Sequence, residues 1–270
     1  MTAGFLAEVV REVAEDVARP EYLDELPEPL FEPRPSLRSA IDQERRRGAL
    51  VVEFKRVSPG QADPRLPERT ADEFLAVTKV PGLAGYSCLA TRPRFEGSPT
   101  DVAEIARRTP HAVLFKDFVL DPRQLDAAVR CGASAVLLIA RLETQGLAPT
   151  PLAELSRGAH ERGLEVLLEL HDPAEVALAE KTPADIYGVN CRDLDTLALD
   201  RPAAERTLEE AWSHGYRPLL GLSGIEKPAD ARRFLDAGAD GILVGSAVAR
   251  AGDPAEFLRS LRETRPEGRR

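Results

Sequence analysis

The chain has 270 residues, enough for one large α/β domain or two small ones, and 43% of them are hydrophobic, which suffices for a sizeable core. Its net charge of −9 argues against nucleic acid or a membrane surface as the partner, because both attract positive charge. The start of the chain lacks the apolar stretch of a signal peptide, and no apolar run approaches a membrane span. Three widely spaced cysteines fit neither a metal site nor a disulfide framework, so we expect a cytoplasmic protein without a metal.

The N-terminal region predicts two helices joined by a proline-rich connector. Apolar residues recur every four positions from Phe5 to Val17, which predicts an amphipathic helix over residues 2–18. Closely spaced prolines then indicate a stiff connector, and Ser36 is placed to cap a second short helix. We expect residues 1–48 to form a helical extension packed on the main domain.

From residue 49 onward the chain alternates between short apolar runs and helical patterns. The apolar runs predict strands at residues 49–54, 85–89, 112–115, 135–139, 165–168, 185–189, 218–222 and 241–244. The helical patterns between and after them cover residues 70–79, 100–108, 122–131, 152–162, 173–181, 203–213, 228–237 and 254–263. Eight continuous apolar strands, each followed by a helix, are typical of a parallel sheet that is buried on both faces.

Eight such units match a closed (β/α)8 TIM barrel of the α/β class. An open, doubly wound sheet is the alternative, but no Gly-x-Gly-x-x-Gly sequence follows the first strand. We therefore predict a barrel domain over residues 49–265, no second domain, and a disordered tail at residues 266–270.

The carboxyl ends of the predicted strands carry ionisable and amide side chains. Glu53 and Lys55 lie on one side of the first strand, and two opposite charges there either pair to close the barrel or do chemistry. Further candidates end the third, fifth and sixth strands, namely Lys116, Glu169 and Asn190. Any one of these could be structural, but all strand ends of a barrel meet at one rim, so together they predict an active site.

The turns after the last two strands predict a phosphate site. Ser223-Gly224 and Gly245-Ser246 lie where barrels commonly hold phosphate, because glycine lets the backbone approach an anion and free amides supply donors. Lys55 and Ser58 could reach the same anion, since the first and last strands of a closed barrel are neighbours.

Other polar residues are given structural roles. The pair His171-Asp172 looks catalytic, but Asp172 is placed to cap the next helix, and no nucleophile accompanies the histidine. We expect Cys191 to be buried rather than reactive. The remaining histidines fall between helices and strands at the opposite end of the barrel and make no metal set; they are His111, His160 and His214.

Eight short motifs occur in order along the predicted strands. They are V-V-E-F-K-R-V-S-P, F-E-G-S, F-K-D-F, A-V-L-L-I, L-L-E-L-H-D, V-N-C-R-D-L, S-G-I and L-V-G-S. Together they resemble the indole-3-glycerol-phosphate synthase family of tryptophan biosynthesis, and the N-terminal helices fit that family's extension over the barrel mouth. The family cyclises 1-(2-carboxyphenylamino)-1-deoxyribulose 5-phosphate with release of carbon dioxide and water. The resemblance implies a carboxy-lyase that acts on a small phosphorylated substrate without an organic cofactor.

The resemblance also implies catalytic roles. Lys116 would be the general acid that protonates the ribulose carbonyl, and we expect desolvation to bring its pKa toward neutrality. Lys55 would bind the anthranilate carboxylate and help the later dehydration. Glu169 would act as acid and base in that dehydration, with Glu53 and Asn190 orienting these groups.

The other matching positions would bind the substrate. The aromatic ring would lie among Phe95, Phe118, Leu137 and Ile139, although core packing accounts equally well for the last two. Contacts to the rest of the substrate would come from Ser58, Arg192, Leu194 and Leu222, and contacts to its phosphate from Ser223, Gly224, Gly245 and Ser246. We expect a monomer or weak homo-oligomer.

The chain departs from the family pattern at several places. Leu222 stands where the family has a glutamate, and Ala90-Thr91, Gly60-Gln61 and Cys191 also differ. These departures predict an altered rate or a related substrate. The alternatives are therefore a diverged paralogue or phosphosugar isomerase that acts on a related phosphorylated substrate, and a non-catalytic protein that binds a phosphoribosyl ligand.

Overall fold

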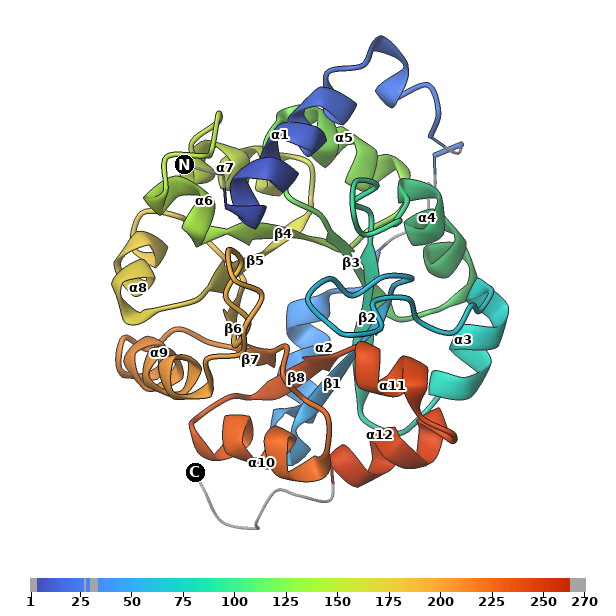
Figure 1. Ribbon diagram of the computed structural model, residues 1–270, viewed down its shortest axis with the longest axis vertical. Coiled ribbons are helices and arrows are strands. Elements are labelled where there is room, and N and C mark those ends of the chain that lie inside the picture. Colours follow the sequence, from blue (N-terminus) through green and yellow to red (C-terminus); the bar gives the residue numbers. More distant parts are fainter. Residues whose placement is uncertain (1–3, 27, 30–33, 263–270) are drawn as a thin grey trace.

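The computed structural model describes residues 4–26, 28–29 and 34–262. Eight parallel strands close into a barrel in chain order, with helices around it (Figure 1). The predicted (β/α)8 barrel is confirmed and the open sheet is wrong, because the first strand pairs with the last as well as with the second. The strands are β1 (Ala49–Phe54), β2 (Leu83–Leu89), β3 (Ala112–Lys116), β4 (Ala135–Ile139), β5 (Glu165–Leu170), β6 (Ile186–Asn190), β7 (Leu219–Leu222) and β8 (Gly241–Val244).

Most of the outer helices begin at a residue whose side chain caps the first turn, including the predicted cap Asp172. Thr70 and Asp121 form capping boxes, and the carboxylate of Asp172 accepts hydrogen bonds from the first turn of its helix. The outer helices are α3 (Ala71–Thr78), α4 (Pro99–Arg108), α5 (Pro122–Arg130), α7 (Leu152–Glu161), α8 (Pro173–Ala179), α9 (Arg201–Ser213), α10 (Pro228–Asp236) and α12 (Pro254–Arg262). Two further helices at the barrel mouth were not predicted, α6 (Ala140–Thr144) and α11 (Ser246–Arg250).

Several predicted strands extend further toward the mouth than their apolar runs. β5 continues to Leu170 because Glu169 and Leu170 pair with Gly188 and Val189 of β6. Lys116 similarly ends β3 by pairing with Leu89 of β2 (Leu83–Leu89). Glu53, Lys116, Glu169 and Asn190 therefore belong to the barrel sheet itself, which fixes their backbone positions, and Lys55 directly follows β1.

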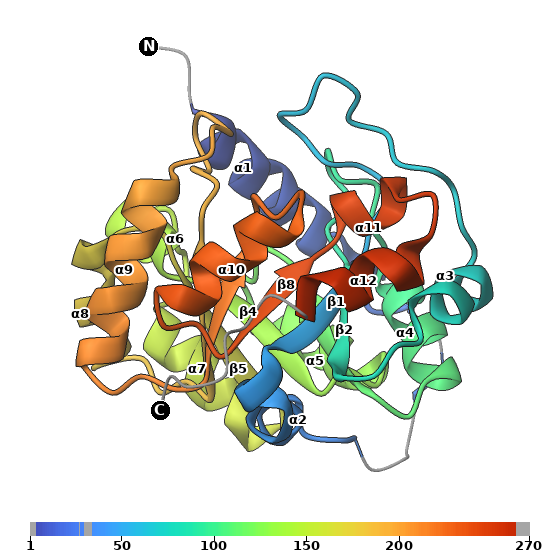
Figure 2. The same ribbon diagram turned by 90° about the horizontal axis from the view of Figure 1, so that it is seen from below.

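The N-terminal helices pack on opposite ends of the barrel (Figure 2). α1 (Phe5–Val17) lies over the mouth, where Arg94 pairs with both Glu8 and Glu12 of the helix. α2 (Leu37–Glu44) lies under the other end, where Glu165 at the start of β5 accepts the backbone N–H of Arg38. The expectation that both helices cover the mouth is therefore wrong for α2. Short 3-10 turns follow the two helices, η1 (Pro20–Tyr22) and η2 (Arg45–Arg47).

Some predicted segments lie outside the described residues. These are the tail at residues 266–270, much of the proline connector, and the outermost residues of the first and last predicted helices. The division of the chain at residues 48 and 265 stays a prediction. Within the described residues, no helix is both long and apolar enough to cross a membrane.

Candidate active site

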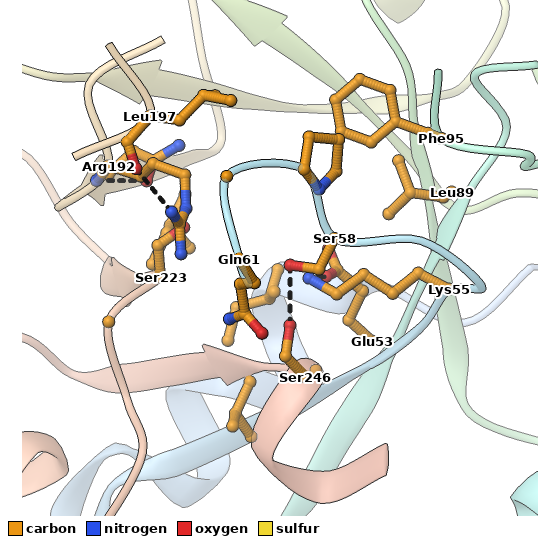
Figure 3. Close-up of a pocket in the computed structure, with 18 of the residues that line it drawn as sticks. Glu53, Lys55, Ser58, Gln61, Leu89, Phe95, Arg192, Leu197, Ser223 and Ser246 are labelled. Carbon is orange, nitrogen blue, oxygen red and sulfur yellow. Dashed lines mark hydrogen bonds and ion pairs between the residues drawn. The ribbon is translucent and has the colours of Figure 1, made fainter. Parts of the chain in front are cut away.

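A cavity of about 990 Å³ opens at the carboxyl ends of the strands, beneath the β1–α3 loop (Figure 3). Every residue predicted from the sequence for catalysis, substrate binding or phosphate binding lines this cavity. The convergence is a consequence of barrel closure, since the strand ends that carry these residues are far apart in the chain and adjacent at the rim.

Glu53 lies between two lysines at the base of the cavity. Its carboxylate is 2.6 Å from Nζ of Lys55 and 3.7 Å from Nζ of Lys116. Burial opposes ionisation of Glu53, but the two ammonium groups outweigh it and lower the pKa of this carboxyl. Side chains two residues apart on an extended chain point the same way, so Glu53 and Lys55 form the predicted ion pair. Lys116 of β3 adds a second cation to it.

The expected direction of the Lys116 pKa shift is wrong. Burial does act to lower it, but Glu53 and Glu169 act more strongly in the opposite direction, and the pKa of Lys116 is raised above its usual value. Desolvation alone would lower the pKa of Lys116. The two carboxylates come from other strands, so their distances to Lys116 are known only once the barrel has formed. Lys116 is therefore held as an ammonium ion, which is the form that can give a proton.

Glu169 lies on the adjacent wall and is held by groups from β6 and from the end of β5. Asn190 donates its side-chain N–H to Oε1 at 3.0 Å, and Nε2 of His171 lies 3.3 Å from the same oxygen. Burial opposes ionisation, but His171, Lys116 and Asn190 outweigh it and lower the pKa of Glu169 to about 2. Oε2 of Glu169 has no hydrogen-bond partner among the described residues.

One of the two Ser-Gly turns, the one after β8, contacts the loop that follows β1. Ser246 donates a hydrogen bond to the hydroxyl of Ser58 at 3.0 Å, which joins the β8 turn to that loop (Figure 3). Ser223 and Gly224 both have positive φ, at 63° and 67°, a conformation that glycine adopts readily and that serine adopts only under strain. At Gly245, a Cβ would lie 2.7 Å from Oε1 of Glu53, so glycine is required for this close approach.

The side of the cavity nearest α1 is apolar. The rings of Phe95 and Phe118 lie 5.7 Å apart, and Phe5 of α1 contacts Phe95 edge-on. Leu137 and Ile139 of β4 are 2% exposed each and face the cavity as well as the core. These two residues therefore pack in the core and also line the cavity, and their contact with a substrate ring stays a prediction.

The β6–α9 segment and β7 supply the remaining predicted residues. Arg192 donates to the backbone carbonyl of Leu197 at 2.6 Å and forms no ion pair with any described residue (Figure 3). Burial lowers the pKa of its guanidinium, which leaves a partly shielded cation facing the cavity. Leu194 is half-buried beside it, and Leu222 is 2% exposed at the end of β7.

Sequence reasoning missed several polar residues of the cavity, among them Thr91 and Asp117. The hydroxyl of Thr91 donates to Asp117 at 2.6 Å, and Gln124 and the amide of Phe118 also donate to this carboxylate. Burial outweighs these hydrogen bonds and raises the pKa of Asp117 to about 6. The only signal in the sequence is the position of Asp117 directly after Lys116.

The structural roles given to other residues are confirmed where they were tested. Asp172 caps α8 through the amides of Ala174 and Glu175. Cys191 is buried, and burial raises the pKa of its thiol to about 11, so it is a poor nucleophile. In the part of the chain that the structure describes, no group of three or more histidine, cysteine or acidic side chains could hold a metal ion.

The cavity thus combines complementary chemical groups. It offers ammonium ions, a buried carboxylate with one unpaired oxygen, an apolar wall with aromatic rings, and Ser-Gly turns beside a guanidinium. Such a site suits a molecule with an aromatic part and an anionic end, on which protons are given and taken at different positions.

Comparison with known proteins agrees with this chemistry. A family model described as "Indole-3-glycerol phosphate synthase" matches residues 4–261. A curated protein named indole-3-glycerol phosphate synthase from Staphylococcus aureus (strain bovine RF122 / ET3-1) is 34% identical over 224 residues, which cover 83% of this chain and 83% of that protein. The protein of the same name from strain Newman is 35% identical over 214 residues, or 79% of each.

Solved structures of similar shape belong to other enzymes. A crystal structure of 3-hexulose-6-phosphate synthase has a TM-score of 0.59 and 17% identity, and covers 80% of this chain and 99% of its own. Thiamine phosphate pyrophosphorylase from Pyrococcus furiosus has a TM-score of 0.56 and 18% identity, and covers 82% and 96% respectively. At such identities the likeness shows the fold alone.

Proposed function

The chain belongs to the indole-3-glycerol phosphate synthase family, and we propose that the cavity at its barrel mouth carries out that family's reaction with the residues described above. The activity is that of a carboxy-lyase in tryptophan biosynthesis, and its substrate is a small phosphorylated molecule. The observation that supports the assignment of residues is the placement of two lysines around Glu53 opposite a carboxylate, Glu169, that has one free oxygen.

In the proposed first step, the ring carbon that carries the carboxylate attacks the ribulose carbonyl of 1-(2-carboxyphenylamino)-1-deoxyribulose 5-phosphate. As the carbon–carbon bond forms, the carbonyl electrons move to oxygen, which takes a proton from the ammonium of Lys116. The raised pKa of Lys116 favours this role, because the group is charged at neutral pH and stabilises the developing alkoxide before the proton moves. Carbon dioxide then leaves, and the electrons of the broken bond restore the aromatic ring.

The proposed second step removes water. The hydroxyl on the new ring leaves with a proton, assisted by Lys55, and the nitrogen lone pair supplies the electrons. Glu169 then takes a proton from the adjacent ring carbon, which gives the indole. Its unpaired Oε2 is the atom available for this transfer, because Oε1 is already held by Asn190.

We propose that the phosphate binds between the two Ser-Gly turns and the β1–α3 loop. Ser246 and Ser58 already contact each other there, so both hydroxyls can turn toward one anion. Gly224, with positive φ, and Gly245 bring the backbone close to the same place. Arg192 supplies an unpaired cation to a polar part of the substrate.

The test is to mix the purified protein with the carboxyphenylamino deoxyribulose phosphate and follow indole fluorescence together with carbon dioxide release. We expect both signals, in equal amounts. A phosphosugar isomerase would change the substrate without releasing carbon dioxide, and a non-catalytic binding protein would bind the substrate and leave it intact. Either result would overturn the proposed function.

A further inference from the structure

His171, at the end of β5, has a buried imidazole that does not line the cavity. Its ring lies between two carboxylates from different elements. Nε2 forms an ion pair with Oε1 of Glu169 in β5 at 3.3 Å, without hydrogen-bond geometry, and Nδ1 is hydrogen-bonded to Oε2 of Glu175 in α8 at 3.3 Å. A histidine that only filled space would not need a carboxylate at each ring nitrogen, since buried charges are costly unless they are paired.

Glu175 is itself held in place. Its Oε2 also accepts the backbone N–H of His171 at 2.7 Å, and its Oε1 accepts Nε–H of Arg141 at 2.8 Å. The other guanidinium nitrogens of Arg141 donate to Asp193 and Asp172. The side chains of Glu175 and Arg141 are only 2% and 13% exposed, so these contacts are shielded from solvent and orient the imidazole firmly.

The imidazole is positively charged at neutral pH. Burial opposes its protonation, but the two flanking carboxylates outweigh burial and raise the pKa of His171 to about 9. On its other side Glu169 faces Lys116 of β3 and Asn190 of β6, and also the like charge of Glu53 in β1. His171 is thus the cation that contacts Glu169 on the side facing away from the cavity.

We propose that His171 is a positioning residue of the reaction, whose imidazolium holds Oε1 of Glu169 so that Oε2 is left ionised and directed toward the substrate. The inference rests on the proposed role of Glu169 and adds the group that orients it. Arg141 and Glu175 hold the imidazolium in turn. His171 does not contact the substrate, because it lies outside the cavity lining.

Two amide substitutions separate the two ring nitrogens. The amide of His171→Gln can take the place of Nε2, whereas that of His171→Asn can take the place of Nδ1 only. Both keep the backbone hydrogen bond to Glu175. We expect His171→Asn to lower kcat about 10- to 100-fold with KM within about threefold, and His171→Gln to lose about fivefold or less.

The pH profile distinguishes positioning from packing. Both substitutions remove the cation, so the pKa of Glu169 rises and the acidic limb of kcat/KM moves to higher pH, by about one unit or more. The substrate phosphate titrates identically in every protein, so the difference from wild type reports the enzyme. A histidine with a packing role alone would lower Tm and leave the limb in place.

Glu175→Gln changes the charge on the imidazole of His171 without substituting His171 or Glu169. Removing this carboxylate lowers the pKa of His171, so the imidazolium is lost at lower pH and the alkaline limb of kcat/KM moves down by about one unit. If His171→Asn does not fold, this variant decides the question alone. Wild-type profiles in folded His171→Asn and Glu175→Gln would overturn the inference.

Two more variants complete the design. His160→Gln is the matched control, because His160 pairs with Asp185 at the opposite end of the barrel and should leave rate and profile unchanged. Glu169→Gln is measured in parallel. If that variant is fully active, the proposed role of Glu169 fails and the inference with it. If it is inactive while His171→Asn behaves as wild type, only the inference fails.

Discussion

Glu53 and Glu169 are both buried carboxylates at the base of one cavity, but they are neutralised from opposite sides. The partners of Glu53 are Lys55 and Lys116, which themselves line the cavity. The nearest cation of Glu169 is His171, which lies behind it and outside the cavity. The Glu53 region therefore presents cations to a substrate, whereas the Glu169 region presents a carboxylate oxygen.

In the proposed mechanism, this difference separates an acid from a base within one small site. Two carboxylates that share every partner titrate as a coupled pair, whereas Glu53 and Glu169 share only Lys116 among the cations that act on them. The lowered pKa of Glu53 keeps it ionised as the counter-ion of the lysines to which we assign the acid chemistry. At Glu169 the proposed arrangement is reversed, and we assign the reactive role to the carboxylate.

Removing Lys116, the proposed acid, should have the largest effect on activity. We expect Lys116→Ala to lower kcat by roughly 10²–10⁴, because it removes the ammonium to which we assign the protonation of the carbonyl oxygen. Thermal stability should change little, since Lys55 still neutralises Glu53 at 2.6 Å. Steady-state kinetics and a melting curve check both statements, with the exposed Lys181→Ala as the control. Near-wild-type kcat would remove Lys116 from the mechanism.

Removing the carboxylate of Glu53 should lower kcat less than removing Lys116, and it should also change the pH dependence of kcat. Glu53→Gln takes away the carboxylate that raises the pKa of Lys116, so this pKa falls and the ammonium is lost at lower pH. We expect kcat to fall by about 10²-fold at pH 8 and the alkaline limb of kcat to move to lower pH. An unchanged limb would mean that Glu53 is structural only.

The strand-end residues could be predicted from the sequence, because two simple periodicities determine them. Short apolar runs separated by helices determine a barrel, and a barrel brings Lys116, Glu169 and Asn190 to one rim wherever they lie in the chain. Capping residues such as Asp172 were also readable, since the cap and the helix it begins are adjacent in sequence.

The charge environment could not be predicted in the same way. The raised pKa of Lys116 depends on Glu53 and Glu169, which reach it from two other strands. His171 and Glu175 are close in sequence, but Glu175 is held in place by Arg141 of α6. The sequence does not predict α6, because no capping residue separates this helix from β4. Distances between elements, rather than patterns within them, determine these features.

The two Ser-Gly turns offer a test of the proposed phosphate site. Ser246→Ala removes a hydroxyl that reaches the proposed anion position, and a hydrogen bond to a charged group contributes about 1.5–3 kcal/mol. We expect KM to rise by roughly 10- to 150-fold with little change in kcat, and inorganic phosphate to inhibit correspondingly less. A parallel loss in kcat with unchanged KM would place the phosphate elsewhere. Gly245 is unsuitable for this test, because any side chain there would meet Glu53.

Leu222 gives the smallest expected effect and the one most particular to this chain. It pairs with Asn190 across the sheet, is 2% exposed, and its Cδ1 fills the space that a Cβ on Gly188 would need. It can offer the substrate only apolar contact, whereas a carboxylate at this rim position could accept hydrogen bonds from substrate hydroxyls or from the anilino nitrogen. We expect Leu222→Glu to raise kcat/KM for the synthase substrate by about tenfold, because one well-placed polar contact contributes about 1–3 kcal/mol.

The expected gain at Leu222 depends on charge as well as shape, so two matched variants accompany it. Leu222→Gln has the size of glutamate without its charge and should recover only part of the gain, and Leu222→Met keeps an apolar side chain of similar volume and should behave as wild type. Burying a carboxylate near Glu169 also opposes folding, so Tm is measured for each protein and should fall in Leu222→Glu alone. If Leu222→Glu stays folded and kcat/KM drops, the apolar side chain belongs to a pocket shaped for a different substrate. The diverged-paralogue alternative would then be favoured over the synthase, and substrates with a bulkier or more apolar ring should be turned over faster by the wild-type protein than by this variant.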